Sequence, residues 1–567
     1  MTKTNKDIEK FQYDHIFNLI LGIFKFNEKK YGNFVKDSIS ILLEFEKNGE
    51  TIIDVDNSLI TFEMLEDGWP NKHLDILKNI NLIGSLNSPF VLLDRNFSLS
   101  KWPRKIERVI NLFLKKIDTD NLMKSTIYAN DNKIDQIKNI FEYSNLVFLQ
   151  GGPGTGKTTL TINLIIELLK IDNFLNIGFS APTGKATARL KEALNDKKNI
   201  SSRKFLDQIE FQTLHRWILN SQNKSLKLNF KLKELDLFII DEMSMVNIDL
   251  IESVLSSLAK DCKIILVGDK NQLSPVNNCS IWNYLFEYCE NSSIKSCVVN
   301  LEKTYRNIGD IALISSLIFN NDYSLLSQKI KELEKYNKSK EVNITKNIGK
   351  DIPKNLFFSI KSHLDKLNLS TSNLSKKKYI FDNGIDNLLP NEKDLVDKIF
   401  LDLQSHLILC EKNSGIWSVE YLNEIIFGQK KPYDLITLNE GVPIMCTKNN
   451  NQLGVSNGDI GVLIGIKNER KYLFRKFNNN NEEIVALIDP SNLENVVPAI
   501  AVTIHKSQGS ESEKVSILWS QKHKRNQYAV NEQKDCENIF CRDNFQKRLF
   551  YTAVTRAKKF LDIYYLN

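Results

Sequence analysis

The chain has 567 residues, more than one ordinary hydrophobic core can organise, which predicts roughly three or four domains of about 150 residues each. Its formal charge of +7, from 76 basic and 69 acidic residues, suits a polyanionic partner without establishing one. The eight cysteines contain no C-x-x-C pair, and no apolar run approaches the about 18 residues of a membrane span. Composition therefore predicts reduced structural cysteines, no metal site built from them, no membrane contact and a cytoplasmic location.

Residues 1 to about 105 alternate amphipathic helical patterns with polar turns. Apolar side chains at Ile16, Leu19, Ile20 and Ile23 recur at helical spacing. The segment contains no recognisable catalytic constellation. It predicts a small helical N-terminal domain, for which docking to a partner and simple packing against the rest of the chain are equally open.

From about residue 106 to 325, short apolar runs alternate with helical patterns. This alternation predicts an α/β domain with a parallel sheet and right-handed crossovers. Ligands gather at the carboxyl ends of parallel strands, so we expect functional residues to follow the strands. The strand candidates are Leu146 to Leu149, Leu175 to Phe179, Leu235 to Ile240 and Lys263 to Val267.

The first of these strands leads directly into the glycine-rich segment 151–159, which fits G-x-x-x-x-G-K-[ST] in full. A helical pattern follows, so backbone N–H groups and a helix N-terminus can surround phosphates. Lys157 would contact the β- and γ-phosphates of ATP, and Thr158 would ligate Mg²⁺. Upstream, Gln136 is either an adenine contact or an ordinary exposed helix residue. The predicted nucleotide-binding residues are Gln136, Gly151, Gly152, Pro153, Gly154, Thr155, Gly156, Lys157, Thr158 and Thr159.

Two later strands end in polar side chains. Asp241 and Glu242 follow the apolar run Phe238-Ile-Ile, where Asp241 suits Mg²⁺ binding and Glu242 can polarise an attacking water. The next strand carries Asp269 and Gln272 at its tip. An amide both donates and accepts hydrogen bonds, so Gln272 is suited to detect a γ-phosphate.

Three polar segments beyond the strands are candidates for contacts with a nucleic acid or a phosphate. The turn that begins at Ser180 offers backbone amides, hydroxyls and Lys185, groups that hold phosphodiester oxygens without reading base sequence. The cluster Thr213-Leu-His-Arg-Trp contains His215 and Trp217, and for Trp217 burial in the core is favoured. Arg306 could reach across a cleft as an arginine finger.

Residues 326–395 are rich in lysine, asparagine and serine with few periodic signals, which predicts a linker or an irregular helical insertion. From 396 to 567 the chain is rich in strands again. Short apolar strands between 443 and 477, two of them joined by an Asn-Gly hairpin signal, predict a small β-barrel inserted at about 432–497.

The last strands of the chain also end in polar groups. An apolar run from Ala499 delivers Thr503 and His505, among other polar side chains, at its carboxyl end. The segment that begins at Leu549 presents Arg556 on a predicted helix before a closing strand from Phe560 to Tyr565. Arg556 is thus a second candidate for contact with a γ-phosphate.

Taken in this order, the segments resemble the motifs of superfamily 1 helicases over about residues 130–320 and 400–565. The sequences GGPGTGKTT, SAPTGKAT, TLHRW, IIDEMSM, VGDKNQLSPV, LEKTYRN, TIHKSQGSE and YTAVTRAKK are most similar to the 5′-to-3′ branch and, within it, to the RecD family. The resemblance implies two RecA-like P-loop domains that close on ATP, with an SH3-like barrel inserted in the second. It further implies an ATP-dependent 5′-to-3′ DNA helicase with single-stranded DNA running across both domains.

The same resemblance assigns roles to individual residues. Those implied in ATP hydrolysis are Lys157, Thr158, Asp241, Glu242, Gln272, Arg306 and Arg556. Those expected to contact DNA, Lys185 from its own chemistry and the others by resemblance, are Thr183, Lys185, His215, Thr503 and His505. The expected cofactors are ATP and Mg²⁺, and no separate carboxylate cluster predicts a two-metal nuclease.

The resemblance also implies RecB-like and RecC-like partners in a heterotrimer that acts on single-stranded and duplex-end DNA in double-strand break repair, recombination and DNA degradation. Two alternatives stay open. One is a free-standing 5′-to-3′ helicase without partners, and the other is a nucleotide-dependent DNA-binding switch without motor activity. The motifs beyond the phosphate loop, around Arg306, Arg556 and 503–511, argue against the switch.

Overall fold

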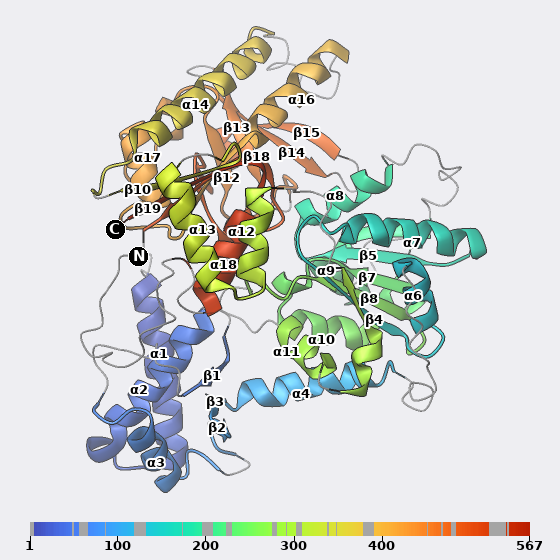
Figure 1. Cartoon of the computed structure of the whole chain (residues 1–567), viewed down its shortest axis with the longest axis vertical. Helices are drawn as coiled ribbons and strands as arrows, with labels where there is room; N and C mark the ends of the chain where they lie inside the picture. Colours follow the sequence, from blue (N-terminus) through green and yellow to red (C-terminus); the bar gives the residue numbers. More distant parts are fainter. Residues whose placement is uncertain are drawn as a thin grey trace.

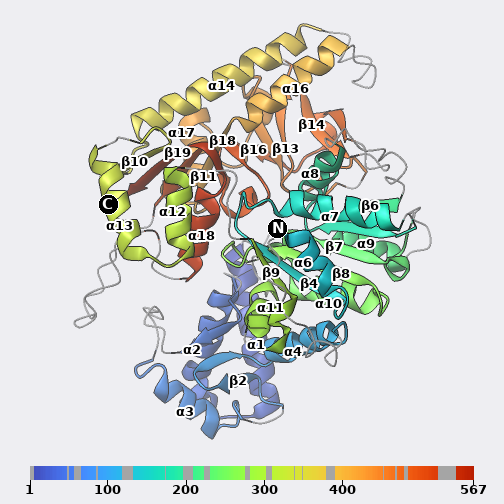
Figure 2. The same cartoon turned by 45° about the vertical axis from the view of Figure 1, so that its right-hand side comes forward.

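The structure is a computed structural model of the chain. The residues that it describes form four sheets with their flanking helices. Figures 1 and 2 show the N-terminal helices at one end of the long axis and two long helices, α14 and α16, at the other. The described residues are 5–47, 50–55, 66–84, 87–117, 132–172, 174–195, 208–222, 230–274, 281–290, 292–301, 309–336, 339–347, 349–377, 390–450, 452–465, 469–477, 483–520, 540 and 544–566.

The N-terminal part combines helices with a small antiparallel sheet in the order β1-β3-β2. The sequence predicted only helices over 1–105, and the strands correct this. Each strand is three or four residues long, which is too short to present a clear alternating pattern. The elements are α1 (Asn5–Phe24), α2 (Glu28–Lys47), β1 (Ile52–Asp54), α3 (Asn71–Asn79), β2 (Phe90–Leu93), β3 (Asn96–Leu99) and α4 (Lys101–Leu114).

Six parallel strands form the first large sheet, in the order β6-β5-β7-β8-β4-β9. The sequence analysis missed β6 because Glu210 and Gln212 interrupt its apolar pattern, although both are buried. The strands are β4 (Leu146–Gly151), β5 (Ile177–Ala181), β6 (Ile209–Thr213), β7 (Leu237–Ile240), β8 (Lys263–Gly268) and β9 (Val298–Leu301). The helices are α6 (Lys133–Ile140), α7 (Lys157–Ile171), α8 (Gly184–Asn195), α9 (Leu214–Gln222), α10 (Ile248–Ser257) and α11 (Ile281–Glu290).

Five parallel strands form the second large sheet, in the order β10-β19-β18-β11-β17. The helices around it include α18, which lies beside α12 (Figure 1). The strands are β10 (Val342–Asn347), β11 (His406–Cys410), β17 (Val502–Thr503), β18 (Ser512–Trp519) and β19 (Ala557–Leu566). The helices are α12 (Asp310–Phe319), α13 (Tyr323–Tyr336), α14 (Lys354–Ser375), α16 (Pro390–Gln404), α17 (Val419–Phe427) and α18 (Asn544–Val554).

The sequence predicted a linker or an irregular helical insertion over 326–395, and the strand at 342–347 contradicts this. β10 is the edge strand of the second parallel sheet and pairs with β19 along its whole length. Its buried residues, Val342 and Ile344, alternate with Asn343 and Thr345 in a short strand within a segment rich in lysine and asparagine, so local composition obscured the strand. Ile311 and Ile314 of α12 also belong to the hydrophobic cluster of this sheet, so its domain begins well before residue 396.

An antiparallel sheet is inserted between β11 and β17, which are neighbours in the second parallel sheet. Its order is β15-β14-β13-β12-β16, so β15 and β16 are its edges. The sequence predicted a closed β-barrel over about 432–497. Closure would require β15 and β16 to pair with each other as well, but among the described residues they are the two edges of the sheet. The strands are β12 (Pro443–Cys446), β13 (Ile460–Ile464), β14 (Lys471–Phe477), β15 (Glu483–Ile488) and β16 (Val496–Pro498).

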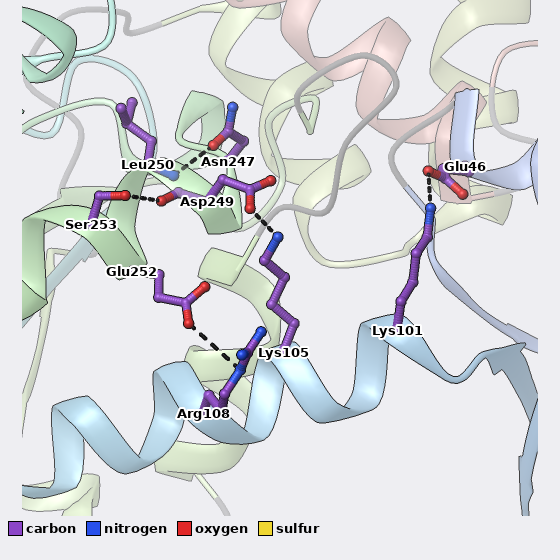
Figure 3. Close-up of polar contacts among 9 residues, drawn as sticks. All are labelled: Glu46, Lys101, Lys105, Arg108, Asn247, Asp249, Leu250, Glu252 and Ser253. Carbon is purple, nitrogen blue, oxygen red and sulfur yellow. Dashed lines mark hydrogen bonds and ion pairs between the residues drawn. The ribbon is translucent and has the colours of Figure 1, made fainter. Parts of the chain in front are cut away.

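The N-terminal part shares one continuous hydrophobic cluster with the first parallel sheet. Figure 3 shows polar contacts that reinforce this packing, where α4 crosses α10. Lys105 pairs with Asp249, and the Nε of Arg108 lies 3.5 Å from Glu252 Oε1. The N-terminal part and the first sheet therefore form one body. No described helix is both long and apolar enough to cross a membrane.

Candidate active site

The phosphate loop connects the fully buried strand β4 to helix α7. Gly154 and Gly156 have φ angles of +74° and +83°, in the left-handed region that glycine tolerates best. A Cβ at Gly151 would lie 2.5 Å from Thr155 Oγ1, so this position also requires glycine. The glycines let the chain turn from β4 into the N-terminus of α7, where the first backbone N–H groups of an α-helix have no acceptor within the helix. Phosphate binding by these groups stays a prediction.

Lys157, the first residue of α7, folds back onto the loop. Its Nζ donates to the carbonyl oxygens of Gly151 at 2.5 Å and Gly152 at 2.9 Å. Thr158 is half-buried and Thr159 is exposed in the same first turn, while Pro153 is half-buried in the loop. An ammonium in this position can exchange the two carbonyl oxygens for phosphate oxygens with little movement of the backbone.

Gln136 lies half-buried on α6, the helix that precedes β4. Its Oε1 accepts a long hydrogen bond of 3.4 Å from Lys133 Nζ. This long, partly buried bond could be exchanged for a base edge, so contact of Gln136 with adenine stays a prediction.

Asp241 and Glu242 follow β7, the strand two positions from β4. Asp241 is buried, and one of its oxygens accepts from the backbone N–H of Glu242 at 2.8 Å. Glu242 has φ +54° and ψ +44°, a left-handed conformation that costs a non-glycine residue on the order of 1–3 kcal/mol. Strain of this kind persists only where the surrounding structure holds the turn in place, and it clusters at functional sites.

The donor atoms around the loop suit a magnesium ion. The Thr158 hydroxyl and the Asp241 carboxylate are oxygen donors, the kind that Mg²⁺ prefers, and the ion completes its shell with phosphates and waters. Among the described residues, no group of three His, Cys, Asp or Glu side chains could hold a metal ion by itself. The residues therefore fit an ion shared with a nucleotide.

Asp269 and Gln272 follow β8, which lies between β7 and β4. Burial raises the pKa of the Asp269 carboxyl, and the nearby positive charge of Lys157 lowers it. Glu242 also acts on Asp269, so the ends of three strands converge here. Gln272 is buried, and its Oε1 has no hydrogen-bond partner among the described residues, which leaves this amide available to a ligand.

A helix that packs on the second parallel sheet contributes Tyr551, a residue that the sequence analysis did not single out. Tyr551 lies on α18, and its hydroxyl donates to Asp269 Oδ2 at 3.0 Å. A Cβ built on Gly152 would meet the same hydroxyl at 3.0 Å. The only signal in the sequence was the place of Tyr551 in the segment YTAVTRAKK.

The two arginines predicted to reach the γ-phosphate have different outcomes. Arg306 lies outside the described residues. Arg556 is buried within the second domain, where its Nε donates to Thr552 O at 3.1 Å and its Nη1 to Ser510 O at 3.3 Å. Its contact with a phosphate stays a prediction.

The candidate DNA contacts beside the first parallel sheet lie at the start of α8 and on α9. The Thr183 hydroxyl accepts from the backbone N–H of Ala186 at 3.2 Å, at the start of α8, and Lys185 follows in that helix. His215 is exposed in the first turn of α9. Trp217 is fully buried and donates to Phe179 O at 3.4 Å, which confirms that it is a core residue.

The candidate DNA contacts in the second domain surround the end of β17. Thr503 is buried in this strand and pairs with Cys410 of β11. The ring of His505 stacks on Phe545 at a centroid distance of 5.8 Å, and burial lowers the pKa of His505 to about 4. At neutral pH His505 is uncharged, so it would contact a strand by hydrogen bonding or stacking.

The chain is similar to several known proteins. The AAA domain family matches residues 136–278. The chain is 30% identical over 530 residues to the RecBCD enzyme subunit RecD of Buchnera aphidicola subsp. Schizaphis graminum, covering 85% of this chain and 82% of that protein. It is 28% identical to the RecD subunit of the Acyrthosiphon pisum subspecies, covering 92% and 87%. Among solved structures, Bacteroides Pif1 helicase in complex with ADP-AlF3 and ssDNA aligns with a TM-score of 0.39 at 17% identity, covering 77% of this chain and 92% of that one.

Proposed function

The chain belongs to the RecD family of superfamily 1 helicases and is an ATP-dependent DNA helicase, and from this premise we propose that it moves 5′ to 3′ along single-stranded DNA as a subunit of a RecBCD-type complex. Its partners are RecB-like and RecC-like subunits, and its substrates are single-stranded and duplex-end DNA. Its role is double-strand break repair, homologous recombination and DNA degradation. The main support is the position of the phosphate loop at the boundary between two parallel sheets, where Tyr551 contacts Asp269.

We assign one RecA-like motor domain to each parallel sheet, with the antiparallel sheet as an SH3-like insertion in the second. Such domains can advance along a strand if ATP closes the cleft and hydrolysis opens it, because each nucleotide state favours one relative position of the two grips. The N-terminal part shares a hydrophobic cluster with the first sheet, so it is carried by the first motor domain.

The nucleotide chemistry follows from the groups around the loop. Lys157 exchanges the carbonyl oxygens of its own loop for the β- and γ-phosphates. Thr158 and Asp241 would hold Mg²⁺, which would neutralise charge on the phosphate oxygens. Glu242 orients the attacking water, and the buried amide of Gln272 responds to the γ-phosphate.

Two arginines complete the proposed transition-state contacts. Arg306 is assigned by resemblance alone, and Arg556 would approach from the turn that follows α18. Arg556 is buried beside Tyr551, whose hydroxyl contacts Asp269, so a small shift of α18 toward the loop brings its guanidinium closer to the phosphates.

The proposed DNA path crosses the carboxyl ends of both sheets. Thr183 and Lys185 contact the phosphates, and His215 is exposed on the adjoining helix. Thr503 and His505 hold the strand on the second domain. Backbone contacts together with stacking, which contributes about 1–3 kcal/mol per base, give a grip that tolerates any sequence.

Partner docking is assigned to the N-terminal part. Helix α1 exposes Leu19 and Ile23, which are 51% and 70% accessible and lie one turn apart on one face. Exposed apolar side chains at this spacing favour contact with a partner subunit.

Unwinding of tailed duplexes tests the motor proposal. We expect ATP-dependent strand displacement on a duplex with a 5′ tail and none on a matched duplex with a 3′ tail. The reverse preference contradicts the polarity, and ATP hydrolysis without displacement on either substrate favours the nucleotide-dependent switch.

Purification of the native complex tests the partner proposal. A stable heterotrimer of this chain with RecB-like and RecC-like subunits supports it. A monomer that unwinds 5′-tailed DNA unaided supports the free-standing helicase instead.

A further inference from the structure

One short segment of the first domain is held by the second. Leu273 follows β8 in the chain, yet its side chain is buried in the hydrophobic cluster of the second parallel sheet. Its backbone N–H donates to Thr552 Oγ1 at 3.2 Å, and its carbonyl oxygen accepts from Gln508 Nε2 at 2.9 Å. The segment between Asp269 and Leu273 is therefore fixed to α18 at one end and to the phosphate-binding edge of the first sheet at the other.

Tyr551 contacts the first domain at the other end of this segment. Its side chain is 2% exposed, and its hydroxyl donates to Asp269 Oδ2 at 3.0 Å. The hydroxyl also lies next to Gly152, where an added Cβ would be 3.0 Å away. Gly152 is one of the two carbonyl acceptors of Lys157, so Tyr551 touches the loop that holds this lysine.

Charges alternate along a row that runs from the phosphate loop to the second domain. The positive charge of Lys157 lowers the pKa of Asp269. The charge of Asp269 raises the pKa of Tyr551, and the charge of Arg556 lowers it. Burial and Asp269 raise the pKa of Tyr551 well above its ordinary value, so the phenol keeps its proton and can donate it in a hydrogen bond. Tyr551 is thus the neutral link between Asp269 and the domain that carries Arg556.

We propose that Tyr551 is a positioning residue for ATP hydrolysis, which holds α18, and with it Arg556, against the phosphate loop through its hydrogen bond to Asp269. The inference rests on the proposed function, because that function gives Lys157 and Arg556 their roles. The hydrogen bond from Tyr551 joins α18 to the edge of the sheet that carries the phosphate loop, so its loss frees α18, and with it Arg556, to move away from the loop.

The variant Tyr551→Phe removes the hydroxyl and keeps the buried ring. We expect kcat for DNA-stimulated ATP hydrolysis to fall about tenfold, the scale of one hydrogen bond to a charged group, with KM for ATP and the Kd for a single-stranded oligonucleotide changed less than about twofold. Tyr565→Phe is the matched control. Tyr565 is also buried in the second domain, but its hydroxyl donates to Glu334 Oε2 of α13 at 3.0 Å rather than to a residue of the first domain. We expect Tyr565→Phe to keep the wild-type kcat.

Three results overturn the inference. The first is a Tyr551→Phe variant with the kcat and KM of the wild type. The second is a Tyr551→Phe variant in which KM for ATP rises while kcat is unchanged. The third is a loss of kcat in Tyr565→Phe equal to that in Tyr551→Phe. These results are distinguishable from a failure of the proposed function. If the proposed function is wrong, Lys157→Ala stays active. If Lys157→Ala is inactive while Tyr551→Phe is fully active, only the inference about Tyr551 is wrong.

A double-mutant cycle tests the route of the effect. If Tyr551 acts through Asp269, the double variant Tyr551→Phe/Asp269→Asn has the kcat of the more impaired single variant. Losses that multiply overturn the proposed route, because they show that the two residues act independently.

Discussion

The ammonium nitrogen of Lys157 lies 2.5 Å from the carbonyl oxygen of Gly151, so the lysine of the phosphate loop is bound by its own loop. A second carbonyl oxygen, that of Gly152, lies 2.9 Å away. These bonds hold the long side chain in one conformation before a nucleotide arrives, which reduces the conformational entropy that binding would otherwise cost.

Removal of this ammonium should stop catalysis and spare DNA binding. We expect Lys157→Ala to lower DNA-stimulated ATP hydrolysis by about 10²-fold to 10³-fold, because one preorganised charge on the transferred phosphoryl group is lost. Affinity for a labelled oligonucleotide, measured by fluorescence anisotropy without nucleotide, should stay the same. Lys138→Ala is the control, since Lys138 pairs with Glu167 between α6 and α7 outside the loop and should keep full activity. Full hydrolysis in Lys157→Ala would refute the assignment of the loop.

A methyl group at Gly156 should disturb the loop itself. Its φ of +83° is strained for alanine, so we expect Gly156→Ala to destabilise the protein by about 1 kcal/mol and to weaken ATP binding, measured by thermal denaturation and by calorimetry. Gly22→Ala is the matched control, because Gly22 lies in α1 with no atom within 4 Å of an added Cβ. Alanine there should stabilise the helix by about 0.5–1 kcal/mol and leave ATP binding unchanged. Tight ATP binding by Gly156→Ala would show that the left-handed turn is not required.

Relief of the strained backbone at Glu242 should separate stability from activity. We expect Glu242→Gly to raise the unfolding temperature, because glycine accepts φ +54° and ψ +44° without strain, and to abolish ATP hydrolysis because the carboxylate is gone. Glu242→Gln keeps the strain and should lose activity by about 10²-fold to 10⁴-fold at unchanged stability. If Glu242→Gly hydrolyses ATP at the wild-type rate, Glu242 does not orient the water.

Two histidines, the buried His363 and the half-buried His406, should make the second domain sensitive to acid. Burial lowers the pKa of His406 to about 3 and that of His363 to about 4, with Lys514 and Lys366 acting in the same direction and Asp402 opposing the shift at His363. The unfolded chain takes up these protons near pH 6.5, at a higher pH than the folded chain. The stability that the neutral rings contribute is therefore present above about pH 6.5 and is lost as the pH falls toward 4.

Thermal denaturation at pH 7.5 and pH 5.5 measures this loss. We expect the unfolding temperature of the wild type to fall more between these two pH values than that of His406→Asn, which cannot take up the proton. His406 Nε2 lies 2.9 Å from Ser516 Oγ, so the variant begins from a lower stability and only the pH-dependent difference is informative. Equal falls in the two proteins would contradict the assignment.

Features that depend on residues close together in the chain could be predicted from the sequence. The phosphate loop is one, because the glycines, Lys157 and the strand and helix that flank them lie within one short segment. The burial of Trp217 is another, since a large apolar ring on an amphipathic helix usually packs into the hydrophobic core. By contrast, β10 was missed because its two buried residues lie in a short strand within a segment rich in lysine and asparagine, and β6 was missed because it carries a buried glutamate and glutamine.

By itself the sequence determined the nucleotide-binding loop, the order of the motifs and thus the family, because each motif is a short pattern whose chemistry is local. Only the tertiary structure decided that Tyr551 meets Asp269 and that Leu273 is buried in the other domain, since these partners are hundreds of positions apart in the chain. It also decided that the segment with β10 completes the second sheet. The physical reason is that hydrogen bonds and burial between distant segments depend on how whole domains pack, which no local pattern of residues records.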